Sequence, residues 1–414
     1  MDIDGERLRA DIEANAAFGA VDADEGRGRT LLTGSDADRA ARQRFVDRLR
    51  DAGLDVRVDA VGNIAGRWTP PGCDPDAAPV AFGSHLDSVP RGGIFDGPLG
   101  TYAALEGVRA MQDAGVTLGR PIEVVSFTEE EGARFGIGTL GSSVAGGHRD
   151  AVDALTLTDD DGVTLRERLD SIGFHGDDRI DPETWDAWME LHIEQGTRLT
   201  GANADVGVVS AVTGITNCEV TIAGEADHAG STPMYDRSDA LTAGAEFVLA
   251  VERAAEEVAA DRESAVATVG QGAIEPNARN IVPGNVRYHL DLRDTDMGTM
   301  DRLVDRCQSS LARLERTAGV ETAIDRYRTS PPTPTADRCL AAAEDAAAAQ
   351  GADAIQLHSA AVHDTAKLAG ATDAGLLFAP SVDGASHSPR EWTDWADCAT
   401  ATGVLAETVR SLAA

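Results

Sequence analysis

The first part of the chain alternates between short apolar runs and stretches with helical spacing of apolar residues. Apolar residues recur every three to four positions from Ser35, a candidate helix N-cap, to Gly53, which predicts a helix between them. Largely apolar stretches at 80–83 and 122–127 predict buried strands, and a second helix is expected over 99–113. Strands that alternate with helices indicate an α/β layer fold.

The pattern changes between about 215 and 327. The expected elements there are strands at 220–223, 266–269 and 286–292 and amphipathic helices over 241–260 and 300–318. Completed by a last strand, the order β-α-β-β-α-β is typical of a compact α+β sandwich with two helices on one face. We therefore expect an inserted domain at 214–329, and a first domain formed by residues 1–213 and 330–414.

Composition narrows the possible functions. The chain carries 70 acidic and 36 basic residues, a formal net charge of -34, and Lys367 is its only lysine. Acid spread along the whole length argues against binding to nucleic acid or to an anionic membrane, and it predicts adaptation to high salt. No apolar run has membrane-spanning length and the N-terminus is acidic, so we expect a cytoplasmic protein. Five scattered cysteines predict neither a disulfide framework nor a thiolate metal site.

Five short stretches carry residues suited to chemistry. They are GSHLDSVPRGGIFDG (83–97), FTEEEGARFG (127–136), ELHIEQG (190–196), GEADHAGSTPMYDRSDA (224–240) and PSVDGASHSPREWT (380–393). The first follows a predicted buried strand, where parallel-sheet proteins place functional groups. Asp87 stands two residues after His85, and an acid there can accept the second imidazole N–H and fix the tautomer that binds metal. Such a pair is more often an ordinary hydrogen bond, so it gains meaning only with the other stretches.

Together the stretches offer three imidazoles and two carboxylates without thiolates: His85, Asp96, Glu131, His192 and His387. This donor set suits borderline divalent cations such as Zn, Mn, Co or Ni. Two ions about 3.5–4 Å apart could share Asp96, with His85 and His192 completing one ion and Glu131 and His387 the other. The glutamate beside Glu131 would then be free to take a proton from a bridging water. Dications also hold adjacent carboxylates ionised, which accounts for three consecutive glutamates.

These residues resemble the aminoacylase/carboxypeptidase superfamily of di-metal hydrolases. They resemble most its amidase branch, which comprises N-carbamoyl-L-amino acid hydrolases, β-ureidopropionases and allantoate amidohydrolases. The resemblance spans essentially the whole chain and is carried by GSHLDS, GIFDGPLG, EEGARF, LHIEQG, HAGSTPM and SHSPREWT. It implies a di-metal exopeptidase-like catalytic domain with an inserted lid and dimerisation domain, and therefore a homodimer.

The resemblance also assigns roles to the three glutamates. It implies that Glu131 is a metal ligand, that Glu130 is the general base and that Glu129 is dispensable. The ligands His85, Asp96, His192 and His387 follow in the roles given above, and Asp87 supports His85.

The substrate-binding residues are implied in the same way. Asn280 and Arg293 match the positions that hold a substrate carboxylate, a contact suited to a guanidinium fork. Gln195 matches a glutamine near the substrate. His228 matches a histidine that polarises the scissile carbonyl, and it would reach the metals by domain closure or from the partner subunit. Without the resemblance, Arg293 would be read as part of a salt bridge on a strand.

The expected reaction is hydrolysis of a small carboxylate-bearing N-carbamoyl amino acid to the free L-amino acid, carbon dioxide and ammonia. Allantoate amidohydrolase and β-ureidopropionase are the nearest alternatives: EEEG favours the allantoate group, whereas GARF favours the carbamoylases. A dipeptidase or N-acyl amino acid deacylase is disfavoured by HIEQG and SHSPREWT. A catalytically silent metal-binding scaffold would require a damaged ligand set or a missing base, and the sequence has neither.

Overall fold

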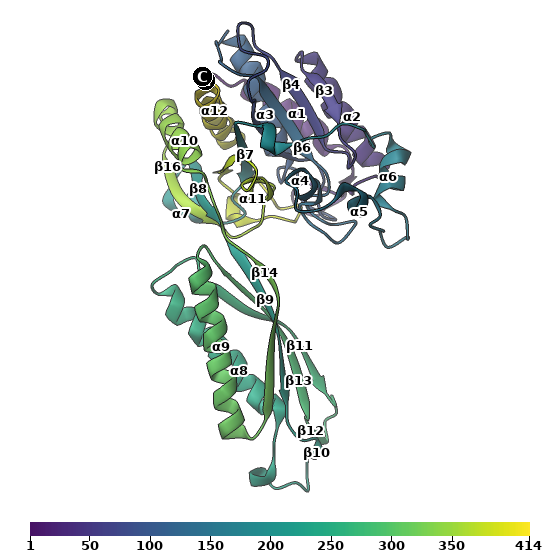
Figure 1. The fold of residues 1–414 in the computed structure, drawn as a ribbon, viewed down its shortest axis with the longest axis vertical. Helices are drawn as coiled ribbons and strands as arrows, with labels where there is room; N and C mark the ends of the chain where they lie inside the picture. Colours follow the sequence, from purple (N-terminus) through teal and green to yellow (C-terminus); the bar gives the residue numbers. More distant parts are fainter. The chain divides into compact units, whose positions relative to one another are not determined.

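The chain divides into two compact units in the computed structural model, which describes residues 1–414 (Figure 1). Unit 1 comprises residues 1–210, 335–357 and 362–414, and unit 2 comprises residues 211–334 and 358–361. The limits expected for the inserted domain, 214–329, fall within unit 2.

Unit 1 contains most of a nine-stranded mixed sheet in the order β15-β8-β17-β7-β5-β6-β4-β3, with β16 paired to β8. The strands of the sheet are β3 (Asp55–Val58), β4 (Ile64–Trp68), β5 (Val80–His85), β6 (Ile122–Phe127), β7 (Ala187–Ile193), β8 (Val206–Val212), β15 (Thr333–Pro334), β16 (Ala354–Ser359) and β17 (Asp373–Ala379). The short strand β15 and the last residues of β8 and β16 fall in unit 2. The neighbours β6, β5, β7 and β17 run parallel to one another, so their carboxyl ends meet at one edge of the sheet.

Helices complete unit 1. They are α1 (Gly5–Ala16), α2 (Asp36–Asp51), α3 (Pro98–Asp113), α4 (Leu140–Ala145), α5 (Ala151–Leu155), α6 (Leu165–Ile172), α7 (Arg198–Ala202), α10 (Asp337–Gln350), α11 (Thr365–Leu368) and α12 (Trp395–Leu412). Two short 3-10 helices, η1 (Pro182–Thr184) and η3 (Val382–Gly384), also belong to unit 1. A small two-stranded antiparallel sheet is formed by β1 (Ala20–Val21) and β2 (Gly28–Arg29). The predicted cap of α2 is confirmed, because Ser35 Oγ accepts a hydrogen bond from Asp38 N at 3.1 Å. None of the helices combines the length and apolar composition that crossing a bilayer requires.

Unit 2 has a separate four-stranded antiparallel sheet in the order β11-β13-β9-β14. Its elements are β9 (Gly214–Ala223), β10 (Asp227–His228), η2 (Met234–Asp236), α8 (Ala240–Ala259), β11 (Val266–Glu275), β12 (Ile281–Val282), β13 (Asn285–Asp294), α9 (Met297–Ala318) and β14 (Glu321–Ser330). The predicted β-α-β-β-α-β order is confirmed, and both long helices cover one face of the sheet (Figure 1). Alternate residues Cys218, Val220 and Ile222 of β9 point into the core with Phe247 of α8.

Candidate metal centre and active site

The carboxyl ends of the parallel strands carry most of the expected metal ligands. His85 is the last residue of β5, His192 lies near the end of β7, and Glu131 follows β6 by four residues. Asp96 precedes α3, and His387 lies in the loop after β17 and η3. The five side chains belong to unit 1 and form two clusters of possible ligand atoms, each cluster within 4.8 Å.

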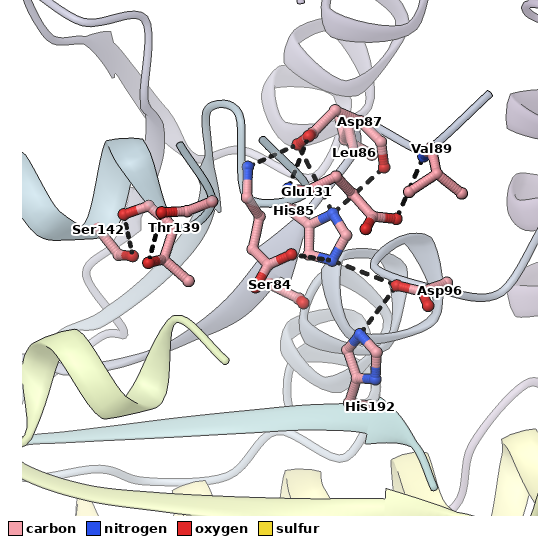
Figure 2. Close-up of polar contacts among 12 residues, drawn as sticks. Ser84, His85, Leu86, Asp87, Val89, Asp96, Glu131, Thr139, Ser142 and His192 are labelled. Atoms are coloured by element: carbon pink, nitrogen blue, oxygen red, sulfur yellow. Dashed lines mark hydrogen bonds and ion pairs between the residues drawn. The ribbon is translucent and has the colours of Figure 1, made fainter. Parts of the chain in front are cut away.

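The first cluster contains His85, Asp96 and His192, all of them buried (Figure 2). Asp96 Oδ1 lies 3.5 Å from His85 Nε2 and 3.1 Å from His192 Nε2. Glu130 Oε2 lies 3.6 Å from the same His85 nitrogen. One carboxylate oxygen therefore faces two imidazoles, with the expected general base beside them.

The second cluster contains Glu131, His387 and again Asp96. His387 Nε2 lies 3.3 Å from Glu131 Oε2 and 3.6 Å from Asp96 Oδ2. Asp96 thus presents one oxygen to each cluster, the arrangement that a carboxylate shared by two cations requires.

The imidazole tautomers indicate what these clusters fit. The Nδ1 atoms of His85 and His192 lie 3.2 Å from the Asp87 carbonyl oxygen and 3.0 Å from the Ile193 carbonyl oxygen. A carbonyl oxygen only accepts, so in each ring Nδ1 is the donor and the neutral ring has its lone pair on Nε2. That lone pair faces a carboxylate, and His85 Nε2 is buried without a hydrogen-bond partner. Two acceptors that face each other require a cation between them, so the residues fit a metal ion.

The electrostatics of the site agree with this fit. Burial lowers the pKa of His85, but the neighbouring Glu130, Asp87 and Asp96 outweigh it and raise that pKa well above the ordinary value. Burial, followed by the charge of Asp96, raises the pKa of Glu131 to about 8. The clustered carboxylates therefore attract positive charge strongly, and a dication supplies more of it than a proton does.

Asp87 supports the site in more ways than the sequence indicated. Its carboxylate was expected to accept the His85 N–H, but Oδ1 is 3.6 Å from Nδ1, farther than the Asp87 carbonyl oxygen. The carboxylate oxygens instead accept hydrogen bonds from Glu130 N at 3.2 Å and Glu131 N at 3.1 Å (Figure 2). Asp87 thereby joins the loop after β5 to the loop after β6.

Glu129, which the resemblance implied to be dispensable, stabilises the turn beside the site. Its backbone is left-handed, with φ of 55°, and its buried carboxylate accepts hydrogen bonds from Arg134 N at 2.7 Å and Phe135 N at 2.8 Å. It therefore shapes the turn that presents Glu130 and Glu131. Glu129 does not stand at the start of a helix, so no capping pattern in the sequence marks these main-chain partners.

Gln195, expected near the substrate, contacts Asp96 in this structure. Its Nε2 donates to Asp96 Oδ2 at 2.8 Å and to Ser386 Oγ at 3.0 Å, and Ser386 Oγ donates to the same Asp96 oxygen at 2.9 Å. These bonds place Gln195 at the oxygen of Asp96 that faces the second cluster.

His228 and Asn280 lie together in unit 2, where β10 pairs with β12. The Asn280 carbonyl accepts from Ala229 N at 3.0 Å. His228 is exposed, and its Nδ1 accepts hydrogen bonds from Gly230 N and Ser231 N, both at 3.0 Å. The ring proton therefore sits on Nε2, which makes this nitrogen a donor suited to a developing oxyanion.

Arg293 lies at the other end of the unit 2 sheet. It pairs with Ile215 across β13 and β9, whereas the end of β13 nearer β12 is Asn285, which pairs with Ala223. The eight residue steps from Asn285 to Arg293 along the strand span about 26 Å. The guanidinium binds the Asp291 carboxylate at 2.7 and 3.2 Å and the Ala360 carbonyl at 2.9 Å. Unit 2 therefore separates Arg293 from His228 and Asn280.

Comparison with known proteins identifies the family. Residues 81–411 match Peptidase family M20/M25/M40. An N-carbamoyl-L-amino acid amidohydrolase of Geobacillus stearothermophilus is 38% identical over 99% of both chains. A ureidoglycolate hydrolase of Arabidopsis thaliana is 32% identical over 92% of this chain and 82% of its own length. The crystal structure of a hydantoinase/carbamoylase family amidase from Burkholderia ambifaria superposes with a TM-score of 0.92 at 38% identity, covering 100% of this chain and 98% of that chain.

The full-length similarity and the shared fold lead to one assignment. The chain belongs to Peptidase family M20/M25/M40 and, within it, to the hydantoinase/carbamoylase amidase branch.

Proposed function

We propose that the protein is a metal-dependent amidohydrolase that converts an N-carbamoyl-L-amino acid to the L-amino acid, carbon dioxide and ammonia. The observation that carries this proposal is the pair of clusters that share Asp96, with Glu130 beside His85. The Geobacillus relative, an N-carbamoyl-L-amino acid amidohydrolase, supports the substrate class.

Two divalent ions (Zn, Mn, Co or Ni) are the proposed cofactors. His85, His192 and Asp96 would hold one, and Glu131, His387 and Asp96 the other. Ions bound there lower the pKa of water and polarise a carbonyl oxygen.

The protein's own groups then move protons and hold the substrate. Glu130 takes a proton from the attacking water and passes it to the leaving nitrogen. His228 donates its Nε2–H to the oxyanion, in keeping with the two backbone N–H groups that occupy Nδ1. Asn280 and Arg293 hold the substrate carboxylate, and Gln195 contacts the substrate from the side of Asp96. In this proposal unit 2 is a lid and dimerisation domain whose closure excludes water.

The separation within unit 2 supports a homodimer with shared active sites. In an N-carbamoyl amino acid only a few bonds separate the carboxylate from the scissile carbonyl, far less than the roughly 26 Å between the two ends of β13. One substrate molecule therefore cannot meet His228 and Arg293 of the same unit 2. We propose that each active site takes these residues from different subunits.

Hybrid dimers test this arrangement. H228A and R293A proteins, each inactive alone, should regain activity when unfolded, mixed and refolded together, because one of the two sites in a hybrid dimer is intact. Each variant refolded by itself is the control. A mixture that stays as inactive as its components would contradict shared sites without affecting the proposed metal centre.

Ureidoglycolate is the second candidate substrate, because the Arabidopsis relative is a ureidoglycolate hydrolase. Ammonia release should be measured in high salt with Mn or Zn on N-carbamoyl-L-amino acids, N-carbamoyl-β-alanine, ureidoglycolate, allantoate and dipeptides. We expect the highest kcat/KM on an N-carbamoyl-L-amino acid. Preference for ureidoglycolate, allantoate or N-carbamoyl-β-alanine would move the assignment within the branch, and metal binding without activity on any substrate would favour a silent scaffold.

We also propose that the acidic composition adapts the protein to a salt-rich cytoplasm. Screening of 70 acidic residues should raise the thermal unfolding temperature as KCl increases from 0.1 M to several molar. A temperature that does not rise with KCl would contradict this.

A further inference from the structure

Asp96 belongs to both clusters, so the orientation of its carboxylate affects both proposed metal sites. Its side chain is held by Gln195 and Ser386, as described above. Its main chain is held by a different residue: Glu391 Oε1 accepts hydrogen bonds from Phe95 N at 2.8 Å and from Asp96 N at 3.0 Å. The contact joins positions 295 residues apart in the chain.

Glu391 is fully enclosed at this contact. The residue is 1% exposed. Its carboxyl group packs against Gly93 so closely that a Cβ at position 93 would lie within 2.2 Å of it. The stretch that carries it is also anchored: Glu391 N donates to Ser388 O at 3.0 Å, and the Pro389 carbonyl accepts from Arg27 N at 2.8 Å. The carboxyl group therefore has little freedom to leave the Asp96 main chain.

Burying a glutamate carboxylate costs desolvation free energy. Glu391 Oε2 has no hydrogen-bond partner. The charge of the fully buried Arg29 acts on Glu391, but a buried ion pair is often no more stable than apolar residues of the same size. The acceptor geometry toward the Asp96 main chain offers a reason for the residue.

We propose that Glu391 is a positioning residue that fixes the main chain at Asp96, so that the two carboxylate oxygens of Asp96 face the two clusters. This inference rests on the proposed metal centre. The same stretch then serves the site twice, because His387 stands at the second cluster and Glu391, four residues on, orients the residue that both clusters share.

Titration calorimetry of Mn²⁺ into the metal-free full-length protein tests the inference. Glu391→Leu leaves the N–H groups of Phe95 and Asp96 without an acceptor, so Mn²⁺ affinity should fall about 10–100-fold. Glu391→Gln keeps a carbonyl oxygen at the same place and should stay within about 3-fold of the wild type, the size of ordinary context effects on such contacts. Gly93→Ala should weaken binding as Glu391→Leu does, because the methyl group displaces the Glu391 carboxylate while leaving it chemically intact.

Glu106→Leu is the matched control. Glu106 is an equally buried glutamate that accepts from a main-chain N–H, that of Asp4 at 3.2 Å, but it lies in the third turn of α3 and outside both clusters. This variant should lower the unfolding temperature and leave Mn²⁺ affinity unchanged.

The outcomes separate the inference from the proposed function. A wild-type protein that binds no Mn²⁺ overturns the proposed metal centre itself. Wild-type binding that is also retained in Gly93→Ala and Glu391→Leu overturns the inference alone. If Glu391→Leu does not fold, Gly93→Ala and Glu391→Gln decide, and a Gln variant as defective as the Ala variant would show that charge, and not position, is what Glu391 supplies.

Discussion

The core of unit 2 contrasts with the strand-end cluster of unit 1, which comprises His85, Asp96, Glu131, His192 and His387 and is buried except at Glu131 and His387. In unit 2, apolar residues such as Val220, Ile222 and Phe247 fill the space between sheet and helices. At the carboxyl ends of β5, β6 and β7, the buried side chains include the imidazoles of His85 and His192 and the carboxylate of Asp87. Three residues at this edge, Glu129, Gln195 and His387, also have positive φ angles of 53–56°.

The difference shows what each region is built to do. Local preferences, burial and capping agree with one another in the core of unit 2, as they do where a sequence has only to specify a stable fold. The strand-end cluster departs from these preferences in two ways, because it contains buried charged side chains and lies beside residues with positive φ angles. Such strained features persist where the surrounding structure holds them in place, and they are typical of functional sites. Stability and chemistry should therefore respond separately to changes in the two regions.

The largest expected effect is on catalysis. Glu130→Gln keeps the size of the side chain but removes the base, so kcat should fall about 10²–10⁴-fold. Mn²⁺ binding should be unchanged, because Glu130 belongs to neither cluster of ligands. Steady-state kinetics and calorimetry on the same preparation check both points. A variant that keeps more than a tenth of the wild-type kcat would show that the base is another residue.

A large effect on stability is expected from unit 2. Phe247 is fully buried and stacks on Tyr288 with ring centroids 6.4 Å apart. Phe247→Ala should cost about 3–5 kcal/mol in the free energy of unfolding by leaving a cavity, and Mn²⁺ affinity should not change. Urea unfolding and calorimetry measure the two quantities. A loss of Mn²⁺ affinity as large as the loss in the free energy of unfolding would show that the two regions are energetically coupled.

Buried carboxyl groups in unit 1 should instead make the free energy of unfolding depend on pH. Asp364 is fully buried, and burial followed by the charge of Glu190 raises its pKa to about 8. Since the folded pKa exceeds the unfolded value of about 3.9, its contribution to stability is complete below pH 3.9 and is lost as the pH rises toward 8. Between pH 5.5 and 8, the metal-free wild type should lose about 3 kcal/mol relative to Asp364→Asn. Urea unfolding of the two proteins at several pH values gives this slope, and parallel curves would exclude a raised pKa at Asp364.

The smallest expected effect concerns an exposed helix cap in unit 2. Asp239 caps α8 by accepting hydrogen bonds from Leu241 N and Thr242 N, both at 3.0 Å. Asp239→Ala should cost about 1 kcal/mol, and Asp239→Asn should recover most of it, because asparagine is an equally good cap. A loss above about 2 kcal/mol would mean that Asp239 does more than cap the helix.

The same contrast explains which features of the fold and of the site could be predicted from the sequence. The elements of unit 2 were predictable because alternating and helical apolar periods follow directly from burial on one face. The convergence of His85, Asp96, Glu131, His192 and His387 was predictable because functional groups collect where parallel strands end. The resemblance to a known family added the role of Glu130.

Other features could not be predicted from one sequence. The roles of Glu129 and Glu391 depend on main-chain N–H groups, which every residue except proline has. Neither residue stands at a helix start, where capping patterns reveal such partners, and Glu391 lies 295 residues from Asp96 in the chain. The wide separation of Arg293 from His228 depends on strand register, which apolar periodicity does not fix over such a distance. The Asp291 partner of Arg293 agrees with the salt bridge expected from the strand alone, and it leaves the role in substrate binding a proposal.

Anomalous scattering from Mn²⁺-soaked crystals of the full chain would show whether two cations share Asp96. We expect two peaks per chain about 3.5–4 Å apart. One should lie against His85 and His192, the other against Glu131 and His387, with the Asp96 carboxylate between them. A single peak, or peaks away from Asp96, would contradict it.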